Sequence, residues 1–284
     1  MVPVAPAIRS IICKSRNKAS FVLFGREFGH TGMLRSLFVP VVLIFLSAPA
    51  AAGNPCPVPF DRLVEALRQS VKASGGPTNG GLDTNEWAAV VDRDGVVCAV
   101  AFSGPDRSAQ WPGSRLVAAE KANTANALSV DGMGLSTANL YAPTQTGGPL
   151  YGLENTNPPN EAAAFAGDPA SFGTANDPLV GKPIGGVVVF GGGLALHDGT
   201  RIVGGLGASG DTSCADHNIA WRLRKSIGLD KLPAGVNPVA KDAIVYDLDP
   251  GGKSASGWGH PKCSGSEADV AAELGAGVGG SLRK

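Results

Sequence analysis

Hydrophobic side chains recur at helical spacing in three stretches of the chain. In the first stretch, Leu63, Leu67 and Val71 follow one another every four positions, and a Gly-Gly-Pro sequence comes directly after the stretch. This spacing places apolar side chains on one helix face, and the Gly-Gly-Pro sequence is a helix stop signal. The same periodicity recurs twice, so the pattern predicts helices over residues 59–74, 112–129 and from about 212 to 228.

Two other stretches have the pattern of β-hairpins. Residues 86–104 contain two runs rich in β-branched residues on either side of an Asp94-Gly95 pair, and residues 185–210 contain two runs around Asp198-Gly199. An Asp-Gly pair between apolar runs is typical of a tight hairpin turn. Hairpins form antiparallel sheets, so the pattern predicts an α+β fold with helices packed on a mostly antiparallel sheet.

Two segments lack this periodicity. Residues 130–184 are rich in Gly, Pro, Asn and Thr. The chain beyond residue 235 is rich in Pro and Gly, apart from a weak strand pattern over residues 242–248. A connection as long as the first is usually functional or part of an interface. We therefore expect a domain over residues 53–235 with an insertion at 130–184, followed by a C-terminal extension over 236–284.

The N-terminal region has the pattern of an export signal. After Met33 the sequence has one basic residue, an apolar run from Leu37 to Leu46, and then small residues up to Ala52. The run is too short to span a bilayer, and the arrangement is typical of a secretory signal peptide. We expect residues 1–52 to be a leader and signal peptide, with Met33 favoured as the true start, and the mature protein to be periplasmic or secreted.

Removal of the leader changes the charge balance. The chain has 24 basic and 24 acidic residues, of which six basic and one acidic lie in residues 1–52, which leaves 18 basic and 23 acidic. A mildly acidic chain without Lys/Arg-rich runs lacks the electrostatic pattern of a nucleic-acid-binding protein. We therefore expect neither a nucleic-acid partner nor a membrane partner for the mature form.

Four cysteines follow the leader. Cys56, Cys98, Cys214 and Cys263 form no C-x-x-C pair, which argues against a zinc ribbon or a thioredoxin motif. An even number of cysteines in an oxidising compartment favours two disulfides, with free buried thiols and metal ligation as the alternatives. Because Cys56 and Cys263 flank the domain, at least one disulfide is expected to tie a terminus to its body.

A glycine-rich stretch precedes the third helix. Gly205, Gly207 and Gly210 have the G-x-G-x-x-G spacing of a dinucleotide-binding loop. That loop requires a parallel βαβ unit, whereas this strand is the second arm of a hairpin, so the nucleotide interpretation fails. A strand that runs into a helix start can hold an anion on free backbone N–H groups. Alternatively, Asp211 and a Ser213/Asp216 capping pair satisfy these groups themselves.

Two further polar side chains lie at unusual places. His217 shares one stripe of the third helix with Cys214 and Trp221, and it is a candidate metal or haem-iron ligand, a candidate general base, or a hydrogen-bonded structural residue. Lys121 lies on the inner face of the second helix, where it either contacts an anion or extends its ammonium group to solvent. No catalytic triad is evident.

Two long stretches together resemble the GlcG/HbpS family of haem-binding proteins. They are VVDRDGVVCAVAFSGPDRSAQWPGSRLVAAEKANTANAL and GGGLALHDGTRIVGGLGASGDTSCADHNIAWRLRKSIGL. The resemblance implies a profilin-like fold, with an antiparallel five-stranded sheet and helices on both faces. It also implies symmetric homo-oligomers, a small-molecule ligand and, in some members, haem as the cofactor. The matching positions expected nearest the ligand are Lys121, Thr124, Gly210, Asp211 and His217, with His217 as the metal ligand.

Two other functions stay open from the residues alone. One is an enzyme acting on a small hydroxy or oxo acid, in which Lys121, Asp211 and His217 supply charge and transfer protons. The other is a structural oligomer without a ligand, whose insertion covers the pocket. The enzyme hypothesis requires the three side chains to meet in one pocket.

Overall fold

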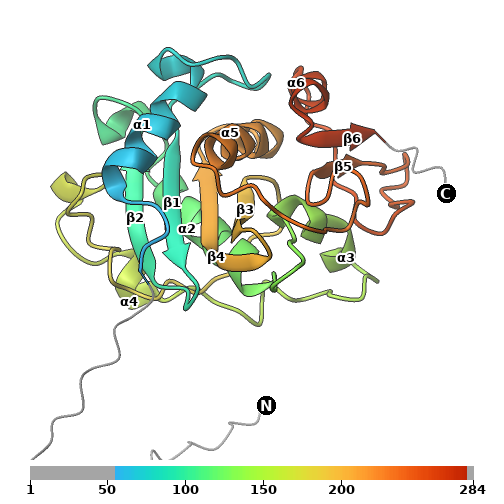
Figure 1. The fold of residues 1–284 in the computed structure, drawn as a ribbon, viewed down its shortest axis with the longest axis horizontal. Helices are drawn as coiled ribbons and strands as arrows, with labels where there is room; N and C mark the ends of the chain where they lie inside the picture. Colours follow the sequence, from blue (N-terminus) through green and yellow to red (C-terminus); the bar gives the residue numbers. More distant parts are fainter. Residues whose placement is uncertain (1–54, 280–284) are drawn as a thin grey trace, which may run out of the picture. The chain divides into compact units, whose positions relative to one another are not determined.

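A four-stranded antiparallel sheet forms the centre of the computed structural model, which describes residues 55–279 (Figure 1). The predicted leader and signal peptide lie outside the described residues. The strands stand in the order β2-β1-β4-β3. Their bounds are β1 Trp87–Asp92, β2 Val97–Phe102, β3 Gly193–Asp198 and β4 Arg201–Ser209.

Both predicted hairpins are confirmed. β1 pairs antiparallel with β2, and β3 pairs antiparallel with β4. The turns contain Gly95 at φ 79° and Gly199 at φ 64°, a left-handed conformation that glycine adopts without steric cost. Pairing of β1 with β4, in which Trp87 lies opposite Ser209, joins the two hairpins into one sheet. The α+β class is therefore as expected.

The expected fifth strand is not confirmed, because the central sheet has four strands in residues 55–279. The stretch from Gly185 to Phe190, part of the predicted second hairpin, is irregular. The Val188 N–H donates to the Thr124 hydroxyl at 3.0 Å, and Gly186 has φ 74°. This side-chain bond and the left-handed glycine replace a strand ladder here.

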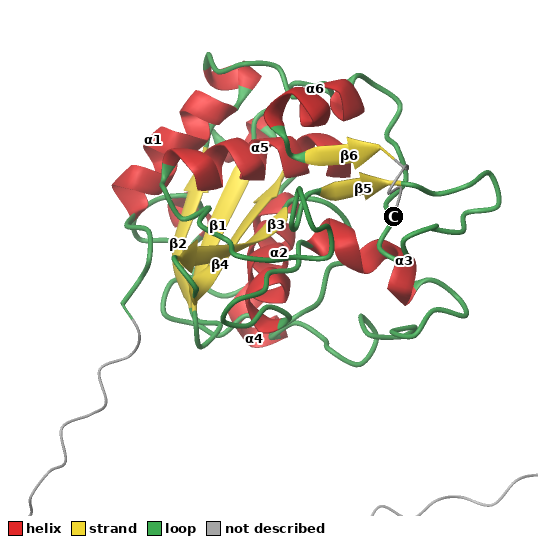
Figure 2. Ribbon diagram, turned by 45° about the vertical axis from the view of Figure 1, so that its right-hand side comes forward, coloured by secondary structure: helices red, strands yellow, loops and turns green. Residues whose placement is uncertain are grey.

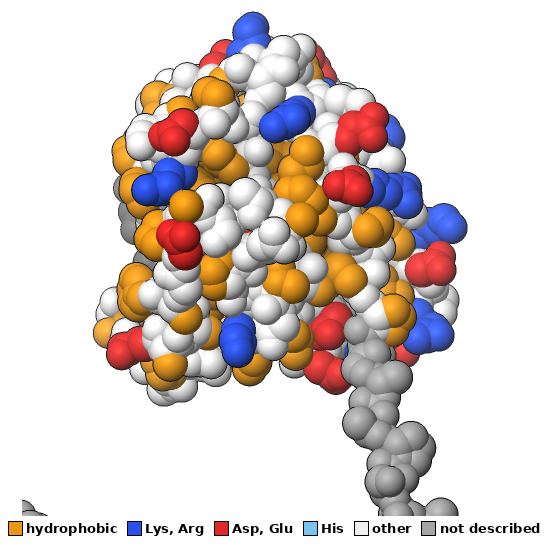
Figure 3. Space-filling view, turned by 90° about the vertical axis from the view of Figure 1, so that its left-hand side faces the viewer, with side chains coloured by type: hydrophobic (Ala, Val, Ile, Leu, Met, Phe, Trp, Pro, Cys, Tyr) orange, Lys and Arg blue, Asp and Glu red, His pale blue; other side chains and the backbone are white. Residues whose placement is uncertain are grey.

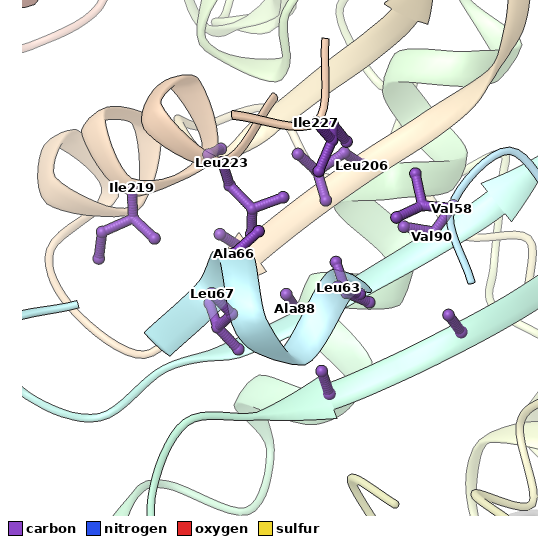
Figure 4. Packing of buried hydrophobic residues seen from close by; sticks show 14 of the residues in the cluster. Val58, Leu63, Ala66, Leu67, Ala88, Val90, Leu206, Ile219, Leu223 and Ile227 are labelled. Atoms are coloured by element: carbon purple, nitrogen blue, oxygen red, sulfur yellow. The ribbon is translucent and has the colours of Figure 1, made fainter. Parts of the chain in front are cut away.

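Helices α1 (Phe60–Ser70) and α5 (Ser213–Ser226) cover one face of the sheet. Leu63 and Leu67 of α1 and Leu223 of α5 point toward the strands, as Figure 4 shows. All three side chains are fully buried. The periodicity that predicts these helices is therefore the pattern of their buried faces. Both helices are slightly shorter than predicted.

Helix α2 (Ser114–Ala127) packs on the opposite face, close to β4. A Cβ atom at Gly205 would lie 2.0 Å from the Ala122 carbonyl oxygen, and one at Gly207 would lie 1.9 Å from the Ala118 oxygen. Only glycine allows this approach of helix and strand backbones. The first two glycines of the G-x-G-x-x-G spacing thus serve helix–sheet packing.

The insertion and the C-terminal extension contain short elements. Ala163 and Ala164 of the insertion pack with the core on the α2 face. In the extension, two short parallel strands and a helix pack beside α5 (Figure 2). The predicted strand at 242–248 is shorter than expected. These elements are α3 Tyr141–Thr144, α4 Glu161–Ala164, β5 Ile244–Tyr246, α6 Glu267–Leu274 and β6 Gly277–Gly279, with 3₁₀ helices at Lys72–Ser74, Arg107–Ala109, Thr137–Leu140 and Pro169–Ser171.

Two disulfides tie the flanking segments to the domain. Cys56 pairs with Cys98 of β2, and Cys214 of α5 pairs with Cys263 of the extension. Of the three alternatives for these cysteines, the structure therefore contains the disulfides, one at each end of the domain. Within residues 55–279, no helix combines the length and apolar character needed to cross a membrane.

Candidate functional site

A hollow of about 460 Å³ lies between helix α1, the turn after β2 and residues 169–174 of the insertion. Figure 3 views the side of the molecule where α1 and β2 lie, and it shows hydrophobic side chains gathered on this face with charged groups around them. We call the hollow the Phe–Arg groove. Its lining includes Phe60, Val64, Arg68, Phe102, Arg107 and Phe172.

Helix α1 supplies one wall of the groove. Phe60, Val64 and Arg68 are spaced four residues apart and so lie on one stripe of the helix. Leu63 and Leu67 occupy the neighbouring stripe, which is fully buried against the sheet. One face of α1 therefore anchors the helix, and the next presents an aromatic ring and a guanidinium group to the groove.

The end of β2 supplies a second wall. The Phe102 ring stacks on the Trp87 ring of β1, with a centroid separation of 4.4 Å. Trp87 is only 1% exposed, so the core fixes its position. A stacked, buried partner holds Phe102 in place at the edge of the groove.

Phe172 of the insertion supplies the third wall, and a buried ion pair holds it. The Arg115 guanidinium lies 3.7 Å from the Phe172 ring centroid and forms an ion pair with Asp177. Asp177 also accepts the N–H groups of Gly173 at 2.8 Å and Leu179 at 2.9 Å. The insertion is therefore held in place beside the groove.

The charged lining has an excess of positive charge. Arg68 and Arg107 are exposed, and Asp106 lies beside them. Hydrogen bonding from Ser108 lowers the pKa of the Asp106 carboxyl, which is therefore ionised at neutral pH. Two guanidinium groups against one carboxylate favour an anionic ligand, because arginine forms paired hydrogen bonds with carboxylates.

Lys121, predicted near the ligand, forms an ion pair within the protein. Its Nζ lies 2.6 Å from the Asp216 carboxylate and donates to the Ala208 carbonyl at 3.1 Å. The Phe190 ring also lies 4.8 Å from Nζ. Lys121 is fully buried, so it does not extend its ammonium group to solvent. The anion that it contacts is a side chain of the protein itself.

Glu86, which the sequence analysis did not single out, lies beside this ion pair. It is fully buried next to Asp216, and neither of its carboxyl oxygens accepts a hydrogen bond from the described residues. Burial raises the pKa of Glu86 well above its ordinary value, and the neighbouring charge of Asp216 raises it further. The sequence does not indicate this buried position, because a single glutamate before a strand belongs to no recognisable motif.

The backbone N–H groups before α5 are already bonded. Those of Gly210 and Asp211 donate to the Asp216 carboxylate at 3.2 and 2.8 Å. The helix is capped by Thr212, whose hydroxyl accepts the N–H of Ala215, rather than by Ser213 as predicted. Of the two alternatives for these N–H groups, the structure therefore supports capping by the protein itself, because the Asp216 side chain reaches back over the turn.

His217 and Thr124 are both fully buried. The Thr124 hydroxyl donates to the Glu120 carbonyl at 2.7 Å and accepts the Val188 N–H. Neither ring nitrogen of His217 has a hydrogen-bond partner among the described residues, and burial lowers the pKa of His217 to about 3. Its ring lies beside that of Trp221, 5.9 Å away between centroids.

The three side chains of the enzyme hypothesis do not form one hydrogen-bonded cluster. Lys121 pairs with Asp216, and Asp211 accepts the N–H groups of Leu82 at 2.7 Å and Thr212 at 2.6 Å. His217 stands apart with unbonded nitrogens. The geometry therefore does not support proton transfer among these groups.

Residues 61–223, more than half of the chain, match the model of the HbpS-like family. The family is described as 'haem degrading protein HbpS-like'. The chain belongs to the HbpS-like family. A search of curated proteins finds no match.

Solved structures similar to this HbpS-like chain include three crystal structures. A PduOC:heme complex is 24% identical, over 60% of this chain and 93% of that one, with a TM-score of 0.41. The Klebsiella pneumoniae protein ORFY is 19% identical, over 59% and 86%, with a TM-score of 0.40. HbpS itself is 18% identical, over 64% and 99%, with a TM-score of 0.36.

Haem, which the family description implies, fits the Phe–Arg groove in part. The aromatic walls suit a flat apolar ring, and the guanidinium groups suit its propionates. The groove lining, however, contains no histidine, cysteine, methionine or tyrosine, the side chains that usually hold haem iron. The lining therefore has side chains of the kind that contact a porphyrin ring and its acid groups, but it supplies no usual iron ligand.

Proposed function

We propose that this member of the HbpS-like family binds haem or a related tetrapyrrole in the Phe–Arg groove. The observation that carries the proposal is the combination of three phenylalanine rings with two arginines around one hollow. The volume of about 460 Å³ lies within the range of small-molecule sites. The description of the family, which names haem, supports the same ligand class.

The physical reason lies in the two halves of such a ligand. A porphyrin has flat apolar faces, which gain stability when they leave water and contact aromatic rings. Its propionates remain charged and favour guanidinium partners at an exposed edge. Arg68 and Arg107 are exposed, so they can hold carboxylates without a large desolvation cost.

The family resemblance predicts ligand contact at five other residues, and that prediction is separate from binding in the Phe–Arg groove. Lys121, Thr124 and His217 are fully buried, so a ligand reaches them only if neighbouring segments move. The groove needs no such movement. We therefore place the ligand in the groove.

Export and self-association belong to the proposal as well. Two disulfides are compatible with an oxidising compartment, and the predicted signal peptide would direct the chain there. We propose a periplasmic or secreted protein that forms homo-oligomers. Light scattering of the purified protein would measure the subunit number.

Titration of the purified protein with hemin tests the ligand and its site. We expect a saturable shift of the Soret band, and at least about a tenfold increase in Kd for the double variant Arg68→Gln/Arg107→Gln, because each lost guanidinium removes a charge-assisted hydrogen bond. Arg201→Gln is the matched control, since Arg201 is exposed on β4 and does not line the groove.

The variant His217→Leu separates the groove from the buried site. If the groove holds the ligand, His217→Leu should bind hemin as the unmodified protein does. A double arginine variant with unchanged affinity, together with a weakened His217→Leu, would refute binding in the groove and favour the buried histidine.

A further inference from the structure

We infer that the Phe–Arg groove recognises its ligand as a planar dicarboxylic acid and that iron contributes little to the affinity. The inference rests on the proposed function and narrows its ligand class. It places metal-free porphyrins beside haem as ligands of the same site. The distribution of donor side chains, in the groove and outside it, carries the inference.

Only two side chains of the groove lining carry an oxygen that could bind a metal. They are the carboxylate of Asp106, which accepts the Ser108 N–H at 2.8 Å, and the hydroxyl of Thr174, which donates to the Ser171 carbonyl at 2.7 Å. Both groups are engaged within their own turns. Neither belongs to the imidazole, thiolate, thioether or phenolate donors that usually hold haem iron.

The histidines in residues 55–279 are all held elsewhere. His197, His217 and His260 are at most 1% exposed. The His197 Nε2 contacts the Val130 carbonyl at 3.3 Å, and the His217 ring lies beside the Trp221 ring on α5. None of them lines the groove.

His260 lines a second hollow of about 410 Å³. Its Nδ1 lies 2.7 Å from the Pro261 carbonyl, and its Nε2 accepts the Gly191 N–H at 3.3 Å. Both nitrogens are therefore used in fixing the extension. Tyr141 and Tyr246 line the same hollow and not the groove, and the four cysteines after residue 54 are closed in disulfides.

The groove supplies guanidinium groups that can bind acid groups and aromatic rings that can contact the faces of a flat ligand. Arg68 comes from α1 and Arg107 from the 3₁₀ helix after β2, so two different walls each carry one guanidinium. Phe102 and Phe172 are fixed by Trp87 and Arg115 respectively, which prearranges their rings. Affinity for such a site depends on the carboxylates and the ring, which a porphyrin possesses with or without a metal.

The experiment compares three forms of one porphyrin against the full-chain protein. Mesoporphyrin IX, its ferric complex and its dimethyl ester are titrated at submicromolar concentration, and quenching of protein fluorescence gives each Kd. We expect the free acid and the ferric complex to bind within about threefold of each other, and the ester at least about tenfold more weakly. Arg68→Gln/Arg107→Gln should weaken the two acids and leave the ester unchanged, whereas Arg201→Gln should change none.

The outcomes separate this inference from the proposed function. A ferric complex that binds at least tenfold more tightly than the free acid would overturn metal-independent recognition while leaving haem binding intact. An ester that binds as well as the acid would overturn the role of the carboxylates. If no form binds, the proposed function itself fails. A second readout is imidazole, which should bind the iron of the protein-bound ferric complex and shift its Soret band, because no side chain blocks it.

Discussion

The Nζ atom of Lys121 lies 2.6 Å from the carboxylate of Asp216, and neither side chain is more than 2% exposed. The pair joins α2 and α5, two helices that pack on opposite faces of the sheet. Asp216 also accepts the N–H groups of Gly210 and Asp211. One carboxylate therefore holds together the end of β4, the start of α5 and the middle of α2.

Replacement of Lys121 by methionine should strongly destabilise the protein. The change leaves the Asp216 carboxylate buried without its counter-charge, which typically costs about 3–5 kcal/mol of unfolding free energy. Urea unfolding at pH 7 measures the difference. The matched control is Lys231→Met, because Lys231 and Asp198 form an exposed pair at 3.5 Å whose loss should cost less than about 1 kcal/mol. Equal stabilities of the two variants would contradict the importance of the buried pair.

Replacement of Glu86 by glutamine should stabilise the protein at alkaline pH. Because the pKa of Glu86 is raised by burial and by Asp216, the folded protein keeps a proton that the unfolded chain loses above about pH 4.3. The contribution of Glu86 is therefore full below that pH and is lost as the pH rises through the folded pKa. Glu86→Gln cannot lose this proton.

The thermal midpoint of Glu86→Gln should therefore equal that of the unmodified protein near pH 4 and exceed it at pH 8. Each kcal/mol corresponds to about 2–4 °C for a domain of this size. Glu65→Gln, at an exposed position on α1, should follow the unmodified protein at both pH values. A lower midpoint for Glu86→Gln at pH 8 would show that the Glu86 carboxylate stabilises the fold.

Local patterns sufficed for most of the fold. Apolar periodicity marks α1 and α5 because their leucine and isoleucine side chains pack on the sheet, and Asp-Gly pairs mark the hairpins because glycine adopts the turn conformation. The G-x-G-x-x-G spacing does not mark a nucleotide-binding loop here. Gly205 and Gly207 are needed because the backbone of α2, which is far away in the sequence, packs directly against them. The fifth strand, which the family resemblance implies and no local pattern marks, is not confirmed in residues 55–279.

The candidate site was much less predictable. Of the groove, only the stripe of Phe60, Val64 and Arg68 follows from local spacing. Phe102 and Phe172 reach the same hollow only after the insertion folds back over β2, which no short-range pattern indicates. The sequence did draw attention to Lys121 and His217. It did not indicate that Asp216 neutralises the first or that the second is enclosed without a hydrogen bond.

His217 and His260 should make the protein less stable in mild acid. Burial lowers their pKa values to about 3 and about 4, whereas the unfolded chain takes up these protons near pH 6.5. Their contribution is therefore present above pH 6.5 and is lost as the pH falls toward 4 and 3. Each imidazole contributes up to about 1.4 kcal/mol per pH unit to this loss.

The variant His217→Leu should remove one of these two titrations. Between pH 6 and pH 4.5, the slope of unfolding free energy against pH, measured in urea, should fall by about 1.4 kcal/mol per pH unit relative to the unmodified protein. At pH 7 the side chain at position 217 is uncharged in both proteins, so the pH-dependent difference between them should be smallest there. Ile219→Leu, a buried replacement on the same helix, should leave the slope unchanged. If His217→Leu also keeps the full slope, the imidazole is protonated in the folded protein near its ordinary pKa, and its enclosure in the core is less complete than the structure describes.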